Sequence, residues 1–264
     1  MVSEQRSIEN AIRGEAPAME TPLPSLVNLQ RGILDPESGE WQTEAEVREL
    51  TGADEEYLSA LESKASTTYA EYMTALLKRT VIRVGTIDIT ASPNLVEQFI
   101  IGDRDNLFMG ILKCTYGQTR EYTVRCSECA KVTDVEIDLD EDFPRQETSV
   151  DLQSPLEAKL RNGKVVKLRL PNGADSAYVG KHSSSTPVQN TLMLSRCAIL
   201  SQDDLGGKTP EEWAKQLSLS DRGKLVKTIL DVKIGPKLEG VNVQCAHCEA
   251  DMPLNLNWMS LLFG

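Results

Sequence analysis

The sequence predicts an α+β fold, built as a tandem duplication of a strand-helix-helix-strand unit whose two halves are joined by a four-cysteine site. Its 264 residues are too many for one ordinary core and suit two domains of about 130 residues each. Hydrophobic residues make up 40% of the chain and charged residues 26%, which is the composition of a folded protein. Four short motifs occur twice in the same order, and the last of them is a pair of cysteines.

The repeated motifs lie 117 to 121 residues apart. Their first residues are Gly52 and Gly173 (Gly-Ala-Asp-x-x-Tyr), Leu77 and Leu194 (Leu-x-Arg-x-x-Ile), Asp103 and Asp221 (Asp-Arg-x-x-Leu-x-x-x-Ile), and Cys126 and Cys245 (Cys-x-x-Cys). The shared order and spacing predict an N-terminal arm at residues 1–24, repeat 1 at 25–145 and repeat 2 at 146–264. The alternative is convergent capping and turn chemistry at unrelated sites.

Each repeat is expected to begin with a strand, at residues 40–50 in the first copy and 164–170 in the second. The second segment alternates apolar and basic residues, as an edge strand does. The aspartate of the glycine motif, Asp54 or Asp175, is placed to cap the helix that follows. In the first copy, apolar residues at helical spacing continue to residue 79 across a Ser-Thr interruption, which predicts a core-facing surface.

A second helix is expected in each repeat after Asp103 and Asp221, with both aspartates as caps and their neighbouring arginines paired locally. Apolar and acidic residues alternate along residues 134–142, which predicts a half-buried strand with a solvated acidic face. The remaining segments are expected to be an interdomain connection at 141–155, a flexible loop at 180–187 and a short helix at 210–217.

The most specific chemistry lies in four cysteines, Cys126, Cys129, Cys245 and Cys248. A C-x-x-C knuckle directs two thiolates at one point, and two knuckles complete the tetrahedral shell of a zinc ion. Alternating segments precede the knuckles at 121–124 and 240–243 and follow them at 135–139 and 254–258, so each half resembles half of a zinc ribbon. We therefore predict one zinc ion per chain, which is structural because four cysteines leave no position for a reactive water.

The 115 residues between the knuckles far exceed the usual ribbon separation of roughly 15 to 20 residues, so the intervening domain must fold back. Two separate half-sites, another metal and ordinary thiols are the alternatives. A redox role for each pair of cysteines is a weaker interpretation, because neither motif begins a helix that would stabilise a thiolate. His247 could replace one thiolate, and Cys114 and Cys197 are expected to be core thiols.

Charge and composition exclude several functions. The net charge of −12 and pI near 4.8 argue against general binding of nucleic acid or anionic membranes, which requires Lys and Arg. With two histidines and no nucleophile-base pair or phosphate loop, neither an enzyme nor a small-molecule substrate is expected. No apolar run reaches the roughly 18 residues of a membrane span, and residues 1–15 lack the apolar stretch of a signal peptide. These features indicate a cytosolic or particle-associated protein.

Several elements follow one another in a recognisable order: Leu23-Pro24-Ser25, the Gly-Ala-Asp-x-x-Tyr unit, Ile101-Gly102-Asp103-Arg104 with Tyr116-Gly117, both C-x-x-C motifs and Leu261-Leu262-Phe263. In these elements, over most of residues 21–264, the chain resembles the baseplate hub family of contractile-tailed (T-even-like) bacteriophages. The resemblance implies a non-enzymatic, zinc-stabilised structural protein of the virion tail baseplate, assembled in the host cytoplasm with other baseplate and tail subunits as partners. A tail-assembly factor absent from the mature virion and a cytosolic zinc-ribbon adaptor or transcription-type factor are the alternatives.

Two segments are candidates for assembly contacts. The arm at residues 1–24 has too little apolar content for a core and is expected to order against a partner, anchored by the apolar residues that follow it up to residue 34. Near the C-terminus, an apolar cluster either closes the protein's own core or is buried against another subunit. The cluster comprises Trp258, Met259, Leu261, Leu262 and Phe263.

Overall fold

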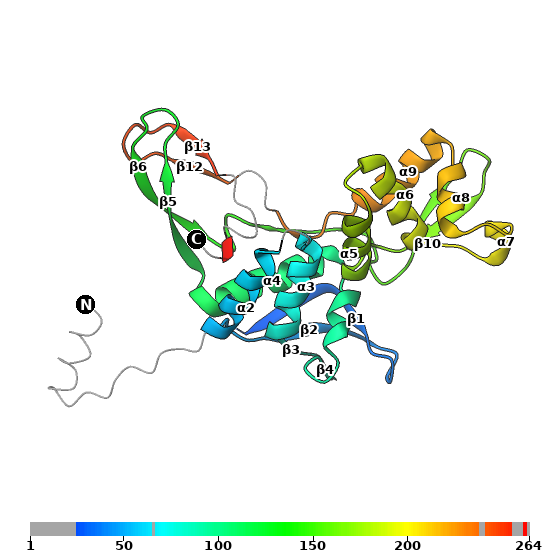
Figure 1. Cartoon of the computed structure of the whole chain (residues 1–264), viewed down its shortest axis with the longest axis horizontal. Coiled ribbons are helices and arrows are strands. Elements are labelled where there is room, and N and C mark those ends of the chain that lie inside the picture. Colours follow the sequence, from blue (N-terminus) through cyan, green and yellow to red (C-terminus); the bar gives the residue numbers. More distant parts are fainter. Residues whose placement is uncertain (1–24, 65–66, 238–240, 255–260, 263–264) are drawn as a thin grey trace.

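Helices and antiparallel sheets form two α+β lobes and a pair of β-hairpins, which lie at one end of the molecule while the second lobe lies at the other (Figure 1). This computed structural model describes residues 25–64, 67–237, 241–254 and 261–262. The mixture of helix and sheet confirms the predicted α+β class. The predicted arm at residues 1–24 lies outside the described residues.

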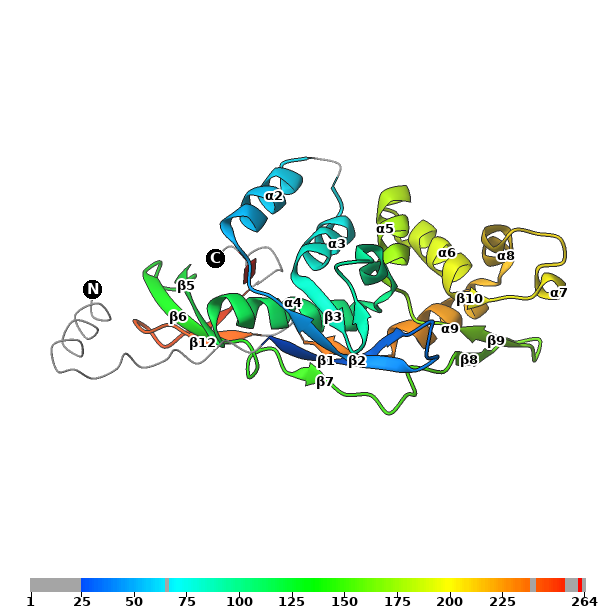
Figure 2. The same cartoon turned by 90° about the horizontal axis from the view of Figure 1, so that it is seen from below.

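The first lobe is a four-stranded antiparallel sheet in the order β1-β2-β3-β4, with helices packed on one face (Figure 2). Its strands are β1 (Leu26–Leu34), β2 (Trp41–Val47), β3 (Val81–Val84) and β4 (Ile87–Asp88), and its helices are α2 (Gly52–Glu62), α3 (Tyr69–Thr80), η1 (Pro93–Gln98) and α4 (Ile101–Tyr116). Helix α4 packs along β1 and is buried over most of its length. Val27, Leu29 and Ile33 of β1 are buried in this core, so much of the predicted apolar anchor belongs to the fold.

The second lobe has a three-stranded sheet in the order β10-β9-β8. Its elements are β8 (Leu156–Lys159), β9 (Val165–Leu168), α5 (Gly173–His182), α6 (Thr186–Cys197), β10 (Ala198–Ile199), α7 (Gln202–Leu205), α8 (Pro210–Gln216) and α9 (Leu219–Leu230). The prediction that residues 164–170 form an edge strand is wrong, because β9 is the central strand. Its alternation arises because one face of the sheet is buried, with Val166 and Leu168 inward and Val165 and Lys167 outward.

Residues from both lobes meet at a junction built from backbone hydrogen bonds. Gly173 N donates to the Phe99 carbonyl at 3.1 Å and Ile101 N donates to the Pro171 carbonyl at 3.4 Å. A second crossing joins β7 (Arg145–Gln146) to β11 (Gly235–Pro236), so the segments that leave and re-enter the first lobe run side by side. The Ile100 side chain is buried in the core of the second lobe.

The residues that cap α2 and α5 lie three residues before the aspartates that were predicted to cap these helices. Thr51 and Asn172 are the N-cap residues of α2 and α5, while Asp54 and Asp175 stand at the third helical position and complete capping boxes. A carboxylate at that position accepts the N–H of the N-cap residue and also favours the positive end of the helix dipole. Both predicted helices are therefore present, but each begins three residues before the start that an aspartate cap would give.

Asp103 and Asp221 likewise stand at the third position of their helices, and the prediction that they are caps is wrong. The Asp103 carboxylate is buried and accepts the backbone N–H groups of Gln30, Arg31 and Gly32 at 2.6, 3.1 and 2.8 Å. Ser218 is the N-cap residue of α9 and its hydroxyl accepts the Asp221 N–H, while the Asp221 carboxylate accepts the Arg161 N–H at 2.9 Å. In both lobes, this aspartate therefore ties a helix to the first hairpin of the sheet.

The local pairing predicted for the neighbouring arginines is also wrong. Arg104 is buried and donates to the Val96 and Ala70 carbonyls and to Thr74 Oγ1. Arg222 donates to the Pro187 carbonyl. The predicted loop at 180–187 is mostly helical, since α5 continues to His182 and α6 begins at Thr186, whereas the predicted short helix is confirmed as α8.

An ion-pair brace occurs at the same place in each lobe. In the first lobe, Asp54 accepts Arg48 Nη1 at 2.7 Å and Arg79 Nε at 2.6 Å, and the Arg79 guanidinium lies over the Tyr57 ring. The second lobe repeats this set of contacts with Arg169, Asp175, Arg196 and Tyr178. Three members of each set belong to the repeated motifs of the sequence, but their pairing was not predicted.

Candidate metal centre

Two β-hairpins carry the four predicted ligands. The first consists of β5 (Thr119–Arg125) and β6 (Val132–Asp138), and the second of β12 (Asn242–Gln244) and β13 (Asp251–Pro253). They lie beside one another at one end of the molecule (Figure 1). The predicted strands at 121–124 and 135–139 are confirmed by β5 and β6, while most of the predicted segment at 254–258 lies outside the described residues.

Each pair of cysteines sits in the same kind of turn. Cys126 N donates to the Lys131 carbonyl at 2.9 Å and Ala130 N donates to the Cys126 carbonyl at 3.0 Å; Cys245 N and the Cys245 carbonyl bond to Ala250 and Glu249 in the same way, at 2.9 and 2.8 Å. Ala130 and Glu249 both have a φ of 58°, the left-handed conformation that non-glycine residues rarely adopt. The backbone therefore makes an equivalent tight turn around each thiol pair.

The two turns bring all four sulfur atoms together, within 4.8 Å of one another. The Sγ atoms of Cys126 and Cys248 are 3.7 Å apart, as are those of Cys129 and Cys245. Four thiolates at about 2.3 Å from a zinc ion in tetrahedral geometry have sulfur-sulfur separations of about 3.8 Å. The cluster therefore has the size of a closed tetrahedral zinc shell, and all four cysteines are unpaired by disulfides.

The cluster is embedded in the protein on one side. Cys126 and Cys245 are buried, Cys129 is half-buried and Cys248 is exposed. Both buried cysteines belong to the core of the first lobe. The His247 N–H lies 3.5 Å from Cys245 Sγ and, as a donor to the thiolate, lowers the pKa of Cys245. The neighbouring thiols of Cys129, Cys245 and Cys126 raise the pKa of Cys248.

His247 and the two remaining cysteines lie outside the sulfur cluster. His247 Nε2 lies 3.2 Å from the Val132 carbonyl, so its ring contacts the opposite hairpin and is not part of the sulfur cluster. Cys114 and Cys197 are buried in the cores of the first and second lobes respectively. Burial raises the pKa of both thiols, that of Cys197 to about 12, as expected for core cysteines.

Residues 261–262 pack against the first hairpin. Leu261 and Leu262 are fully buried, and the Leu262 carbonyl accepts the Tyr116 hydroxyl at 3.0 Å. Arg120 Nη1 donates to the Leu261 carbonyl, and the guanidinium lies over the Tyr116 ring. These two residues of the predicted C-terminal cluster therefore close the protein's own core, while Trp258, Met259 and Phe263 lie outside the described residues.

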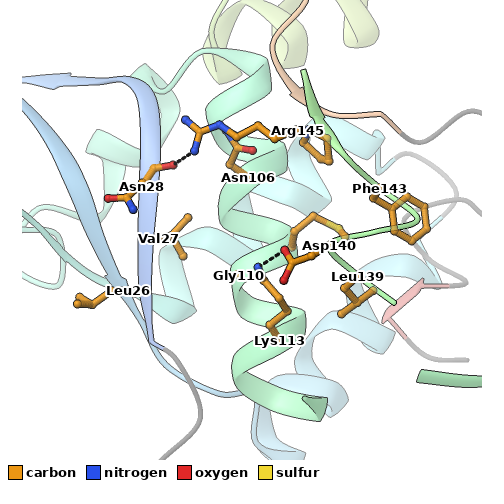
Figure 3. A pocket seen from close by; sticks show the side chains of 12 residues that line it. Leu26, Val27, Asn28, Asn106, Gly110, Lys113, Leu139, Asp140, Phe143 and Arg145 are labelled. Carbon is orange, nitrogen blue, oxygen red and sulfur yellow. Dashed lines mark hydrogen bonds and ion pairs between the residues drawn. The ribbon is translucent and has the colours of Figure 1, made fainter. Parts of the chain in front are cut away.

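A cavity of about 350 Å³ lies between β1, α4 and the segment that follows β6 (Figure 3). The polar groups in its wall already have partners: Lys113 Nζ bonds Asp140 at 2.7 Å and Arg145 bonds the Asn28 carbonyl at 3.1 Å. Its described lining contains no cysteine, histidine or serine. Lys113 and Asp140 form an ion pair in the wall of the cavity.

The described helices include none that is long and apolar enough to span a bilayer. Together, the fold and the cysteine cluster define an α+β protein with a closed four-thiol site of the size that a structural metal ion requires. The family comparison then places the chain among known proteins: the sequence model of the T4 bacteriophage base plate protein family matches residues 35–263. The chain belongs to this family, which confirms the predicted relationship to phage baseplate proteins. No curated protein and no solved structure matches the chain.

Proposed function

We propose that this protein is a non-enzymatic structural component of a contractile phage tail baseplate, in its hub region, and that it acts in tail assembly through protein-protein contacts. The single observation that carries the proposal is the gathering of four thiols from two hairpins that are 119 residues apart in the sequence. Such a closed site supports architecture rather than turnover, because it leaves no position for substrate or water. The family match supports the virion location.

Zinc is the metal that best suits this donor set. Four thiolates at tetrahedral spacing favour zinc over the harder magnesium and calcium ions, which prefer oxygen ligands. Bound at Cys126, Cys129, Cys245 and Cys248, one zinc ion per chain would fix the second hairpin onto the core of the first lobe. It would thereby close a loop that includes the whole second lobe, so metal binding and folding would be coupled.

We further propose that the chain arose by tandem duplication, with repeats at 25–145 and 146–264. Strands β1 and β2, helices α2, α3 and α4, and hairpin β5–β6 correspond in order to β8, β9, α5, α6, α9 and β12–β13. The brace of two arginines around Asp54 corresponds to that around Asp175. Asp103 and Asp221 correspond in tying a helix to the first hairpin. In this scheme the metal site joins the ends of the two repeats.

The proposal is tested by complementation of a phage that lacks this gene, followed by mass spectrometry of purified tails. Wild-type protein should restore infectivity and appear in the tails, whereas Cys126→Ser and Cys245→Ser should each fail to restore tail assembly. Cys114→Ala, a change of a core thiol outside the cluster, is the matched control and should retain function.

Three outcomes would overturn parts of the proposal. Full infectivity of both Cys126→Ser and Cys245→Ser would show that the four-cysteine site is not required for tail structure. A protein that is required for assembly yet absent from purified tails would identify an assembly factor that leaves the particle. A protein that is neither required nor incorporated would favour the cytosolic adaptor instead.

A further inference from the structure

The charges of this protein are separated along its length. Residues 155–237 carry 14 Lys and Arg against 8 Asp and Glu, whereas residues 25–154 carry 12 against 25. The second lobe is therefore basic by 6 charges and the remainder of the described chain is strongly acidic. The hairpin β5–β6 and the second lobe lie at opposite ends of the molecule (Figure 1), so the negative charge of this hairpin lies far from the basic lobe of its own chain.

The basic lobe presents the uncovered face of its sheet, which we call the basic sheet face. It consists of the outward residues of β8, β9 and β10: Glu157, Lys159, Val165, Lys167 and Ile199. Val165 and Ile199 are 49% and 47% exposed. Lys167 lies 4.0 Å from Glu157, at the limit of an ion pair, and Lys224 Nζ bonds the Lys159 carbonyl at 2.6 Å, which brings a third ammonium group to the edge of the face.

The hairpin β5–β6 presents the complementary surface, which we call the acidic hairpin face. Glu121 and Glu136 stand directly opposite one another in the ladder, and both are exposed. Like charges at such a position destabilise a sheet, and in the described part of the chain neither carboxylate has a cation as an ion-pair partner. Asp134 extends the negative row. At the end of the same face lie Val132, which is 48% exposed, and the exposed Arg125 opposite it in the ladder.

We propose that the basic sheet face of one copy docks on the acidic hairpin face of a second copy, head to tail. Both faces are small and antiparallel and carry an exposed valine at one end, Val165 on the sheet and Val132 on the hairpin. Lysines on one face would oppose the paired glutamates on the other. Opposite charge would relieve the repulsion between Glu121 and Glu136 and orient the encounter. A contact between two different surfaces of identical chains is heterologous, so repetition yields a ring or an open chain.

The experiment is sedimentation velocity of the metal-loaded full chain at about 20 mM and about 0.5 M salt, where charge interactions are weakly and strongly screened respectively. Wild-type protein should associate in a concentration-dependent manner at low salt and dissociate at high salt. Lys159→Gln with Lys167→Gln, and separately Glu121→Gln with Glu136→Gln, should each weaken association at least about fivefold. An equimolar mixture of the two variants should form a heterodimer, because each retains one intact face.

The matched control is Lys215→Gln with Lys227→Gln, which removes the same charge from exposed lysines of α8 and α9 and should leave association unchanged. Wild-type protein that stays monomeric at low salt overturns the proposal. So does association that survives in both face variants or a mixture that fails to restore it. The inference goes beyond the proposed baseplate role, and either can fail without the other.

Discussion

The junction between the lobes can be tested by adding one methyl group. Gly173 is the first residue of α5, and a Cβ at this position would lie 2.1 Å from Arg104 Nη1 and 2.6 Å from its Cζ. Gly52 is the first residue of α2 in the first lobe, and a Cβ there would meet nothing within 4 Å. The substitutions Gly173→Ala and Gly52→Ala are therefore chemically identical but differ in their surroundings.

The magnitude follows from what Arg104 would lose. Its guanidinium is buried and bonds Thr74 Oγ1 at 2.8 Å and the Val96 and Ala70 carbonyls at 2.9 and 3.2 Å. A hydrogen bond to a charged group contributes about 1.5–3 kcal/mol, and overpacking costs about 1–3 kcal/mol. If the side chain shifts enough to break one of these bonds, Gly173→Ala should lower the free energy of unfolding by about 2–4 kcal/mol. Gly52→Ala should raise it by up to about 1 kcal/mol through the entropy of the unfolded chain.

The assay is urea denaturation of both variants followed by circular dichroism, with the metal-loaded wild-type protein as reference. If the free energy of unfolding falls with urea concentration at the same slope as in the wild-type protein, the variants unfold from the same compact state. If both variants had the same stability, or if Gly173→Ala were the more stable, the close approach of Arg104 to α5 would be refuted.

Three further changes test the remaining contacts. Asp103→Ala leaves three backbone N–H groups without an acceptor and should cost about 2–4 kcal/mol in urea denaturation. Asp221→Ala, at a half-buried aspartate that accepts a single backbone N–H, should cost about 1 kcal/mol. The Arg48 guanidinium holds the pKa of Asp54 well below its usual range. This carboxylate therefore contributes its full stabilisation above its unfolded pKa of about 3.9. The contribution is lost progressively as the pH falls toward the folded pKa. The Asp54→Asn variant should therefore have a lower free energy of unfolding than the wild-type protein at pH 7 and should lose less of it between pH 5 and pH 2. If the free energy of unfolding of the variant fell with pH as steeply as that of the wild-type protein, the brace would be contradicted. His247→Ala should leave the zinc content per chain unchanged, since its ring contacts the Val132 carbonyl and not the ion, and a fall in zinc content would make His247 a ligand.

Local patterns carried the predictions that the structure confirms. The cysteine spacing identified all four members of the cluster because a C-x-x-C turn is set by a few neighbouring residues. The alternation along residues 134–142 identified β6 because Val135 and Ile137 face the core. Such signals depend on the periodicity of one element and need no knowledge of its neighbours.

Contacts between distant segments could not be read in the same way. Asp54 at the third helical position and a cap at Thr51 satisfy similar patterns, so the helix start was misplaced by three residues. The Asp103 carboxylate accepts the backbone N–H groups of Gln30–Gly32, about 70 residues earlier in the chain. Nothing in the sequence around Asp103 indicates that partner. The same holds for the buried guanidinium of Arg104, whose surroundings come from α3, η1 and α5.

The most direct test of the central claim is the zinc content per chain of purified, folded protein, measured by inductively coupled plasma mass spectrometry. A single site shared by Cys126, Cys129, Cys245 and Cys248 predicts one zinc ion per chain, and none in the Cys126→Ser variant. Folded wild-type protein with no zinc would contradict the account, and two zinc ions per chain would show that the knuckles bind metal separately.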